Sequence, residues 1–117
     1  MSTKVETINL DDYRARDEKK GIISKVFTGR DRGEIVRKNC RLDEIEKVAE
    51  QIIIIVPEDI YSINPSFFEE LFVNVVKKLG KEKFLEKFKF EYNGFNFEDK
   101  LVEAIDRILR DDNALIV

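Results

Sequence analysis

The chain has 117 residues, of which 43% are hydrophobic and 38% charged, and its formal net charge is -3. This length predicts one domain, the composition is too apolar for a disordered chain, and no run of about 20 apolar residues could cross a bilayer. There is no histidine and only one cysteine, Cys40, which excludes histidine-based triads, the common zinc sites and an internal disulfide. Because only one cysteine is present and no charged-then-apolar leader opens the sequence, we expect a soluble protein of the reducing cytoplasm. Because histidine-based catalytic sites and the common zinc sites are excluded, we also expect that it uses no cofactor and no metal.

The charges are unevenly distributed along the sequence. Residues 14–41 contain ten Lys or Arg and four Asp or Glu, a net charge of +6, whereas residues 42–117 have a net charge of -7. A basic segment can attract phosphate, nucleic acid or an acidic protein. The acidic residues between the cations favour an ordinary solvated surface instead.

The first 20 residues predict an N-terminal strand followed by a polar connection. Apolar and polar residues alternate from Lys4 to Leu10, and residues 11–20 are almost wholly polar up to Gly21. A second strand is expected over residues 22–27. Thr28 can then cap a helix that begins near Arg30, with Asp31 as its capping-box partner.

The most secure strand is the run Ile52–Val56, in which every residue is β-branched and which ends at Pro57. Because a strand that is apolar on both faces needs cover on both, we expect it at the centre of an α/β sheet. A short helical stretch over residues 43–51 precedes this strand.

Three further elements follow. Residues 64–80 carry an apolar stripe with helical spacing that ends at Gly80, and a short helical turn is expected around Phe84. Alternation over residues 88–92 predicts a strand, after which Asn93-Gly94 fits either a hairpin turn or, better, a connection into a last helix over residues 98–110. The chain is therefore predicted as a single α/β domain of order β-β-α-β-α-β-α, with a mixed sheet of about four strands and helices packed on it. The first strand and its polar connection occupy residues 1–20, and residues 21–117 form the rest of the domain.

Two turns carry the motifs of the chain. One is the segment from Asp59 to Phe72, where a buried strand and a short turn lead to a serine and then to Phe-x-x-Glu-Leu-Phe. The other is Thr28-Gly29-Arg30-Asp31-Arg32-Gly33, an Arg-bearing turn that leads into the first helix. With these features, residues 21–110 resemble the STAS-like domain family of unknown function, which is related to the STAS domains of anti-sigma-factor antagonists and sulfate transporters.

The resemblance implies a non-enzymatic regulatory module of bacterial-type signalling, in which a partner kinase phosphorylates a serine at a helix start and thereby switches off the binding of a protein partner. The matching serine is Ser66, although the antagonists typically have Asp-Ser-Ser-Gly where this chain has Asn64-Pro65-Ser66-Phe67. The candidate partner surface comprises Ser62, Asn64, Pro65, Ser66, Glu69 and Glu70.

Ser66 also has a purely structural interpretation. With Glu69 three residues later it can form a capping box, or Asn64 can be the cap with Pro65 at the first helical position. Either arrangement accounts for these residues without signalling.

The Arg-bearing turn supports a rival function. Thr28, Gly29, Arg30 and Arg32 could bind a phosphate or nucleotide through backbone N–H groups and guanidinium groups, with weak catalysis by Glu69 or Glu70. The glycine spacing matches neither a Walker A sequence nor a dinucleotide fingerprint, so a capped helix start with surface arginines is the alternative.

A third function is a nucleic-acid accessory role for residues 14–41. Five of the aromatic residues beyond Tyr61 lie on inward phases and are expected in the core, as is Cys40; they are Phe67, Phe68, Phe72, Phe88 and Phe90. Edge strands of small sheets pair readily, so the sequence also allows a homodimer.

Overall fold

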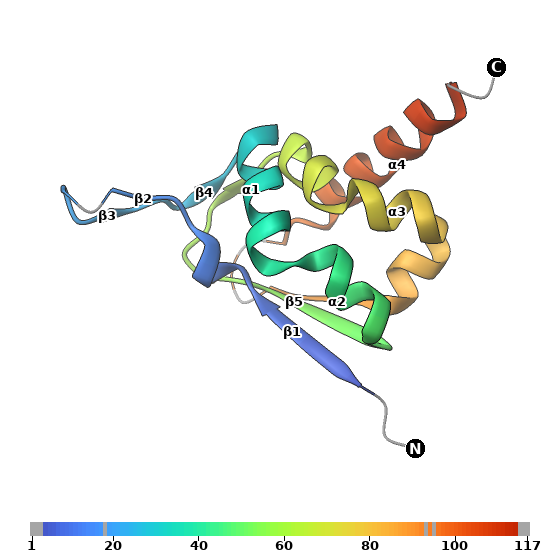
Figure 1. Cartoon of the computed structure of the whole chain (residues 1–117). Coiled ribbons are helices and arrows are strands. Elements are labelled where there is room, and N and C mark those ends of the chain that lie inside the picture. The colour runs from blue at the N-terminus through green and yellow to red at the C-terminus, as the bar shows by residue number, and fades with distance from the viewer. Residues whose placement is uncertain (1–3, 18, 93, 95, 115–117) are drawn as a thin grey trace.

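The computed structural model describes residues 4–17, 19–92, 94 and 96–114, and it has the mixed α/β class that the sequence predicts. Its elements in chain order are β1 (Val5–Asn9), the 3-10 helix η1 (Leu10–Tyr13), β2 (Arg16–Asp17), β3 (Ile22–Ile23), β4 (Val26–Phe27), α1 (Arg30–Cys40), α2 (Leu42–Val48), β5 (Gln51–Val56), β6 (Ser62–Ile63), α3 (Pro65–Lys87), β7 (Phe88–Tyr92) and α4 (Glu98–Ala114) (Figure 1). None of the helices in these ranges is long and apolar enough to cross a membrane.

The main sheet has three strands in the order β1-β5-β7, and both pairings are parallel. The run of β-branched residues in β5 thus forms the central strand, as predicted, but the described sheet is parallel and smaller than the mixed sheet of about four strands that we expected. The expected strand over residues 22–27 divides because the Ser24 hydroxyl bonds to the main chain of Val26, accepting from its N–H at 3.3 Å and donating to its carbonyl oxygen at 3.0 Å. Such local bonds compete with a continuous ladder. β3 pairs with β2 and β4 pairs with β6.

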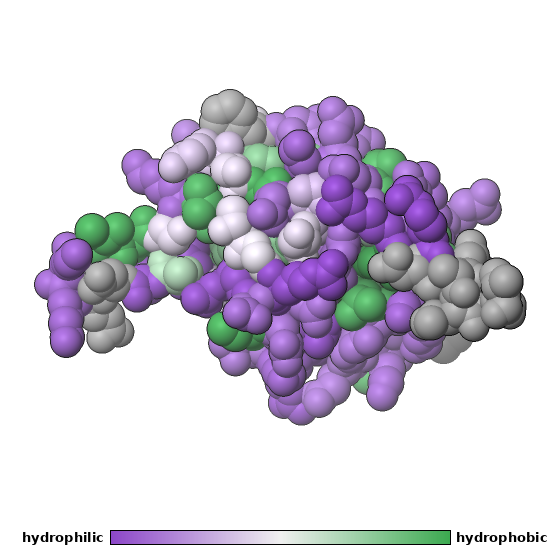
Figure 2. Space-filling model, turned by 90° about the horizontal axis from the view of Figure 1, so that it is seen from above, coloured by the Kyte–Doolittle hydropathy of each residue, from purple (hydrophilic) through white to green (hydrophobic). Residues whose placement is uncertain are grey.

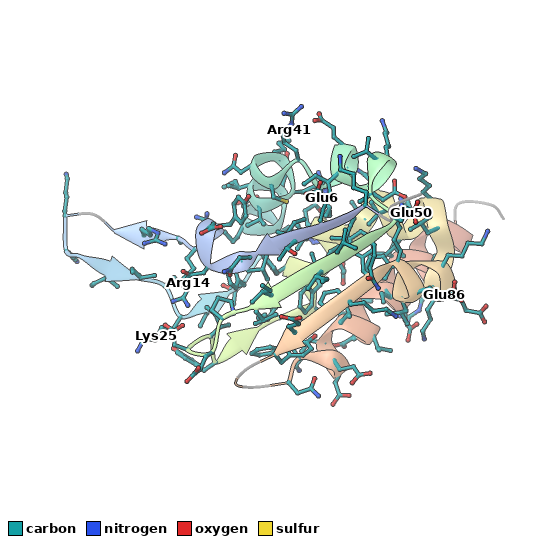
Figure 3. The ribbon with its side chains drawn as sticks, turned by 90° about the horizontal axis from the view of Figure 1, so that it is seen from below. Glu6, Arg14, Lys25, Arg41, Glu50 and Glu86 are labelled. Carbon is teal, nitrogen blue, oxygen red and sulfur yellow. The ribbon has the colours of Figure 1, made fainter. Side chains whose placement is uncertain are left out.

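The helices lie on one face of the main sheet only (Figure 1). In β5 the side chains of Ile52, Ile54 and Val56 are buried beneath them, whereas those of Gln51, Ile53 and Ile55 alternate toward the other face and are partly exposed. Seen from that side, the three strands lie in front and the helices behind (Figure 3). The expectation that both faces are covered is therefore not met by the described residues.

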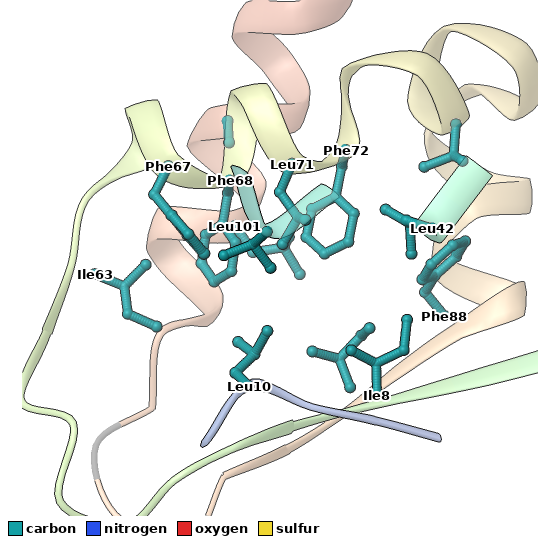
Figure 4. Close-up of a cluster of buried hydrophobic side chains, with 14 of the residues drawn as sticks. Ile8, Leu10, Leu42, Ile63, Phe67, Phe68, Leu71, Phe72, Phe88 and Leu101 are labelled. Atoms are coloured by element: carbon teal, nitrogen blue, oxygen red, sulfur yellow. The ribbon is translucent and has the colours of Figure 1, made fainter. Parts of the chain in front are cut away.

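Phenylalanines dominate the core between the sheet and α3 (Figure 4). The rings of Phe68 and Phe72 stack at a centroid separation of 5.8 Å, and those of Phe84 and Phe88 stack at 4.6 Å. Gly80 interrupts α3 with a φ of 80°, where the sequence predicted its end, and the chain then resumes helical structure and buries Phe84. This confirms the core positions expected for the aromatic residues.

The N-terminal connection is more structured than the sequence indicated. Arg14 is only 9% exposed, and its guanidinium forms ion pairs with Asp11 at 2.9 Å and with Asp59. The hydrogen bonds from Arg14 keep the pKa of Asp59 below its usual value. Beyond Arg14 the β2–β3 hairpin projects from the body (Figure 1), and its residues Ile22 and Ile23 are 56% and 43% exposed. Hydrophobic surface is visible on this projection at the left of Figure 2.

Candidate functional site

The two motif-bearing turns lie side by side in the structure. β4 and β6 pair in parallel, with Val26 opposite Ser62 and Phe27 opposite Ile63. Each of these short strands leads directly into a helix, so α1 and α3 begin next to each other. The N–H of Asn64 donates to the carbonyl oxygen of Phe27 at 3.2 Å and joins the two turns. We call the region formed by residues 28–32, residues 62–70 and Arg107 the α1/α3 site.

Asn64 holds both helix starts with one side-chain oxygen. Its Oδ1 accepts from the N–H of Phe67 at 3.2 Å, which makes Asn64 the N-cap of α3, and from the N–H of Gly29 at 3.3 Å. Pro65 occupies the first helical position, so the prediction that pairs an Asn64 cap with Pro65 is confirmed. The predicted capping box between Ser66 and Glu69 is wrong, because Ser66 lies inside α3 after the Asn64 cap and Glu69 accepts from Arg30 and Arg107.

The start of α1 also differs from the prediction. Gly29 is at the N-cap position with a φ of 88°, and no side chain caps the helix there. Thr28 is exposed and does not serve as the cap. A φ of this sign favours glycine, and the Gly29 N–H is satisfied from α3 by Asn64 rather than by a neighbour in the sequence. The local capping pattern therefore misses a bond between residues 35 positions apart.

α1 and α3 approach each other closely at Gly33. A Cβ atom at this position would lie 2.6 Å from the carbonyl oxygen of Phe67 and 2.8 Å from the Cβ of Glu70. Both distances are shorter than van der Waals contact allows, so the crossing requires glycine. Gly33 thus fixes how near the two helix starts can lie.

Glu69 is at the centre of an ion-pair network instead of a capping box. Its side chain is 8% exposed and accepts from Arg30 at 3.3 Å and from Arg107 at 3.1 Å. The hydrogen bond to Glu69 raises the pKa of Arg107 above its usual value. Arg107 comes from α4, and no local pattern around it predicts that it joins the motifs. The network links the first turns of α1 and α3 to the last helix.

The remaining candidate residues differ in accessibility. The Arg30 side chain is 67% exposed, while Ser62, Ser66 and Arg32 are partly exposed. Glu70 accepts from Arg37 at 3.3 Å. Hence both carboxylates that the rival hypothesis assigned to catalysis are engaged by arginines, and Ser66 lies on α3 one turn before Glu69.

Other features of the chain lie away from this site. Hollows of about 280 Å³ between β7 and α4 and of about 450 Å³ between β1 and α2 are lined by other residues. Cys40 is 5% exposed, as predicted, and burial raises the pKa of its thiol to about 11. Among the described residues, no cluster of carboxylates and thiols could hold a metal ion.

Comparison of the sequence with models of known families and with curated proteins, and of the fold with solved structures, found no match.

Proposed function

We propose that this chain is a non-enzymatic regulatory module of the STAS-like type, with the α1/α3 site as its surface for a protein partner. The observation that supports this function best is the double hydrogen bond to Asn64 Oδ1, which brings both motif-bearing turns into one surface. Two segments that resemble recurring patches of one family thus meet, although 35 positions separate Gly29 from Asn64. A contiguous, part-exposed surface built from two rigid helix starts suits protein recognition.

Phosphorylation of Ser66 is the switch in this proposal. A phosphoserine adds a charge of about -1.5 to -2 at neutral pH, and the first turn of a helix stabilises negative charge. Because residues three apart on a helix are neighbours, the phosphate would lie beside Glu69 and within reach of the exposed Arg30 that Glu69 now holds. The phosphate would compete with Glu69 for Arg30 and would add negative charge to the site. Both effects would change the surface that the partner binds.

Contacts within the site favour this function over binding of a small anion. Two of the four residues that would hold a phosphate already have partners within the site, since the Gly29 N–H donates to Asn64 and the Arg30 guanidinium donates to Glu69. A small anion would therefore compete with Asn64 for the Gly29 N–H and would share Arg30 with Glu69. A protein partner can instead contact the charged rim of the site without breaking these bonds.

Contacts along the basic segment also weigh against a role in nucleic-acid binding. Arg14 is buried against Asp59. Lys38 on α1 pairs with Glu34, and Arg41, between α1 and α2, pairs with Glu44. These pairs reduce the positive potential that phosphate backbones would meet.

The test is affinity capture with the full chain as bait in an extract of its own cells, followed by binding assays with the captured protein. Arg30→Glu and Ser66→Asp are compared with wild type. Lys38→Glu is the matched control, because Lys38 is an exposed cation on the same helix, 68% exposed against 67% for Arg30, and is likewise paired with a glutamate. Ser66→Ala controls for loss of the hydroxyl alone.

Both test variants are expected to weaken binding of the same partner by about tenfold or more, while both controls bind as wild type does. Equal binding by all variants would contradict the proposed function. Loss of binding in Lys38→Glu as well would show that general charge, rather than the α1/α3 site, controls the interaction.

A further inference from the structure

The face of the main sheet that lies opposite the helices carries an apolar centre. Ile53 and Ile55 of the central strand β5 face this side, are partly exposed and take no part in the core beneath the helices. Val5 of the edge strand β1 is 46% exposed on the same side. Figure 3 shows the three strands from this side, with no helix in front of them. We call this surface the open sheet face.

An open face is unusual for a sheet of this kind. Parallel sheets are found almost only where both faces are covered, and their strands accordingly are apolar throughout. The sequence of β5 is apolar on both faces, as such a strand is, yet the described residues cover one face. Ile53 and Ile55 are thus residues typical of a covered sheet face, but no element of the described residues covers them.

The residues around the two isoleucines form two rows whose chemistry is complementary. The register places Thr7, Ile53 and Lys89 in one row across the strands. Asn9, Ile55 and Glu91 form the next row. Each row thus has a small polar side chain on β1, an isoleucine on β5 and a charged side chain on β7, and the charges of the two rows have opposite signs.

We propose that a second copy of this chain covers the open sheet face, packed face to face about a two-fold axis that runs across the strands between the two rows. This axis places the first row of one copy over the second row of the other. Ile53 then packs against Ile55 of the other copy, and Lys89 meets Glu91 twice, once on each side. In the single chain the ammonium of Lys89 donates to the carbonyl oxygen of Leu85 at 3.2 Å, and its side chain lines the hollow between β7 and α4, so formation of the dimer includes a turn of this side chain toward the open sheet face.

The dimensions of the face limit the strength of this dimer. Three strands about 4.8 Å apart with a rise of about 3.3 Å per residue give a face of roughly 15 by 18 Å, below the area of a permanent interface. The dimer is therefore weak and transient, and it requires a high protein concentration. It uses neither the edges of the sheet nor the α1/α3 site, so it is independent of the proposed function.

The experiment is sedimentation velocity of the full chain from about 10 µM to about 1 mM, a range that spans transient interfaces. The test variant carries Ile53→Thr and Ile55→Thr, which keep β-branched side chains in the strand and remove apolar surface. Ile22→Thr is the matched control, because Ile22 is a strand residue that is 56% exposed on the projecting hairpin. Circular dichroism at the lowest concentration verifies that each variant is folded.

We expect the wild type and Ile22→Thr to shift from monomer to dimer across this range, and the double variant to stay monomeric. A wild type that remains monomeric throughout, or a double variant that dimerises as the wild type does, would overturn the proposal.

Charge exchange gives a second test. Lys89→Glu places like charges together in both Lys89–Glu91 pairs, which lie over β7 on either side of the axis, and should weaken the dimer by about tenfold. Adding Glu91→Lys to this variant restores opposite charges and should restore the wild-type association. If the exchange variant stays as weak as Lys89→Glu alone, the proposed axis is wrong.

Discussion

The close crossing of α1 and α3 at Gly33 makes Gly33→Ala a direct test of the geometry of the α1/α3 site. The added Cβ atom would lie 2.6 Å from the carbonyl oxygen of Phe67, which is a main-chain atom of α3. A flexible side chain could move aside, but a helix backbone can move only if α1 and α3 separate. We therefore expect the two helix starts to move apart by several tenths of an ångström.

Two opposing effects determine the change in stability. Alanine is intrinsically better than glycine in a helix by about 0.5–1 kcal/mol. Overpacking a close-packed contact costs about 1–3 kcal/mol, and contact with backbone favours the upper end of that range. The net effect is a loss of about 2 kcal/mol in the free energy of unfolding, which lowers the Tm by roughly 6–12 °C in a domain of this size.

Thermal and urea unfolding of Gly33→Ala measure this loss. Asn39→Ala is the control, because Asn39 is exposed on the same helix and this substitution changes helix propensity without the close contact; it should leave the protein as stable as wild type or slightly more stable. If Gly33→Ala were as stable as wild type or more stable, the reasoning would be refuted. The gain in helix propensity would then exceed the cost of the contact with Phe67, so α1 and α3 could not lie as close as described.

Three further substitutions or reactions test separate contacts. Asn64→Ala should cost about 1–2 kcal/mol in the free energy of unfolding and speed hydrogen exchange at the Gly29 and Phe67 amides, whereas Asn64→Asp should retain most of the stability. Burial disfavours the charge of Glu46, but hydrogen bonds from two lysines outweigh burial and lower its pKa in the folded chain. The stability that Glu46 contributes is therefore present above its pKa in the unfolded chain, about 4.3, and is lost as the pH falls through the lower folded pKa. Urea unfolding from pH 7 to pH 3 should show this loss in wild type and a weaker pH dependence in Glu46→Gln. Because the pKa of Cys40 is about 11, a thiol reagent at pH 8 should modify the folded chain far more slowly than the urea-unfolded chain.

Each of these expectations has a distinct contrary result. Unchanged exchange at both amides in Asn64→Ala would mean that the shared hydrogen bonds do not form. Identical pH dependence of wild type and Glu46→Gln would remove Glu46 from the acid response. Equal thiol reactivity of the folded and unfolded chains would show that Cys40 is accessible.

The main elements of the fold could be predicted because their patterns are local. The β-branched run over residues 52–56 identified the central strand, and the stripe over residues 64–80 identified the first part of the long helix, although α3 continues beyond the end predicted at Gly80. The strand over residues 88–92 and the last helix also have the predicted positions, although α4 extends further. Asn93 and the apolar residues 115–117 lie outside the described residues, so the turn prediction at Asn93 remains a prediction.

What the sequence missed depends on contacts between distant residues. Local capping rules selected Thr28 for α1 and offered either Ser66 or Asn64 for α3. They could not show that Asn64 also accepts from the Gly29 N–H, because this bond forms only where β4 and β6 place the two helix starts side by side. Arg107 joins the network of Glu69 only because α4 packs against α3. No periodicity within one element could indicate either contact.

The measurement that tests the central claim most directly is the affinity of the captured partner for the chain with phosphoserine incorporated at position 66, compared with the chain that has Ser66. The account predicts that binding to the phosphorylated chain is at least about tenfold weaker, because the phosphate competes with Glu69 for Arg30 in the partner surface. Equal affinity for both forms would contradict it.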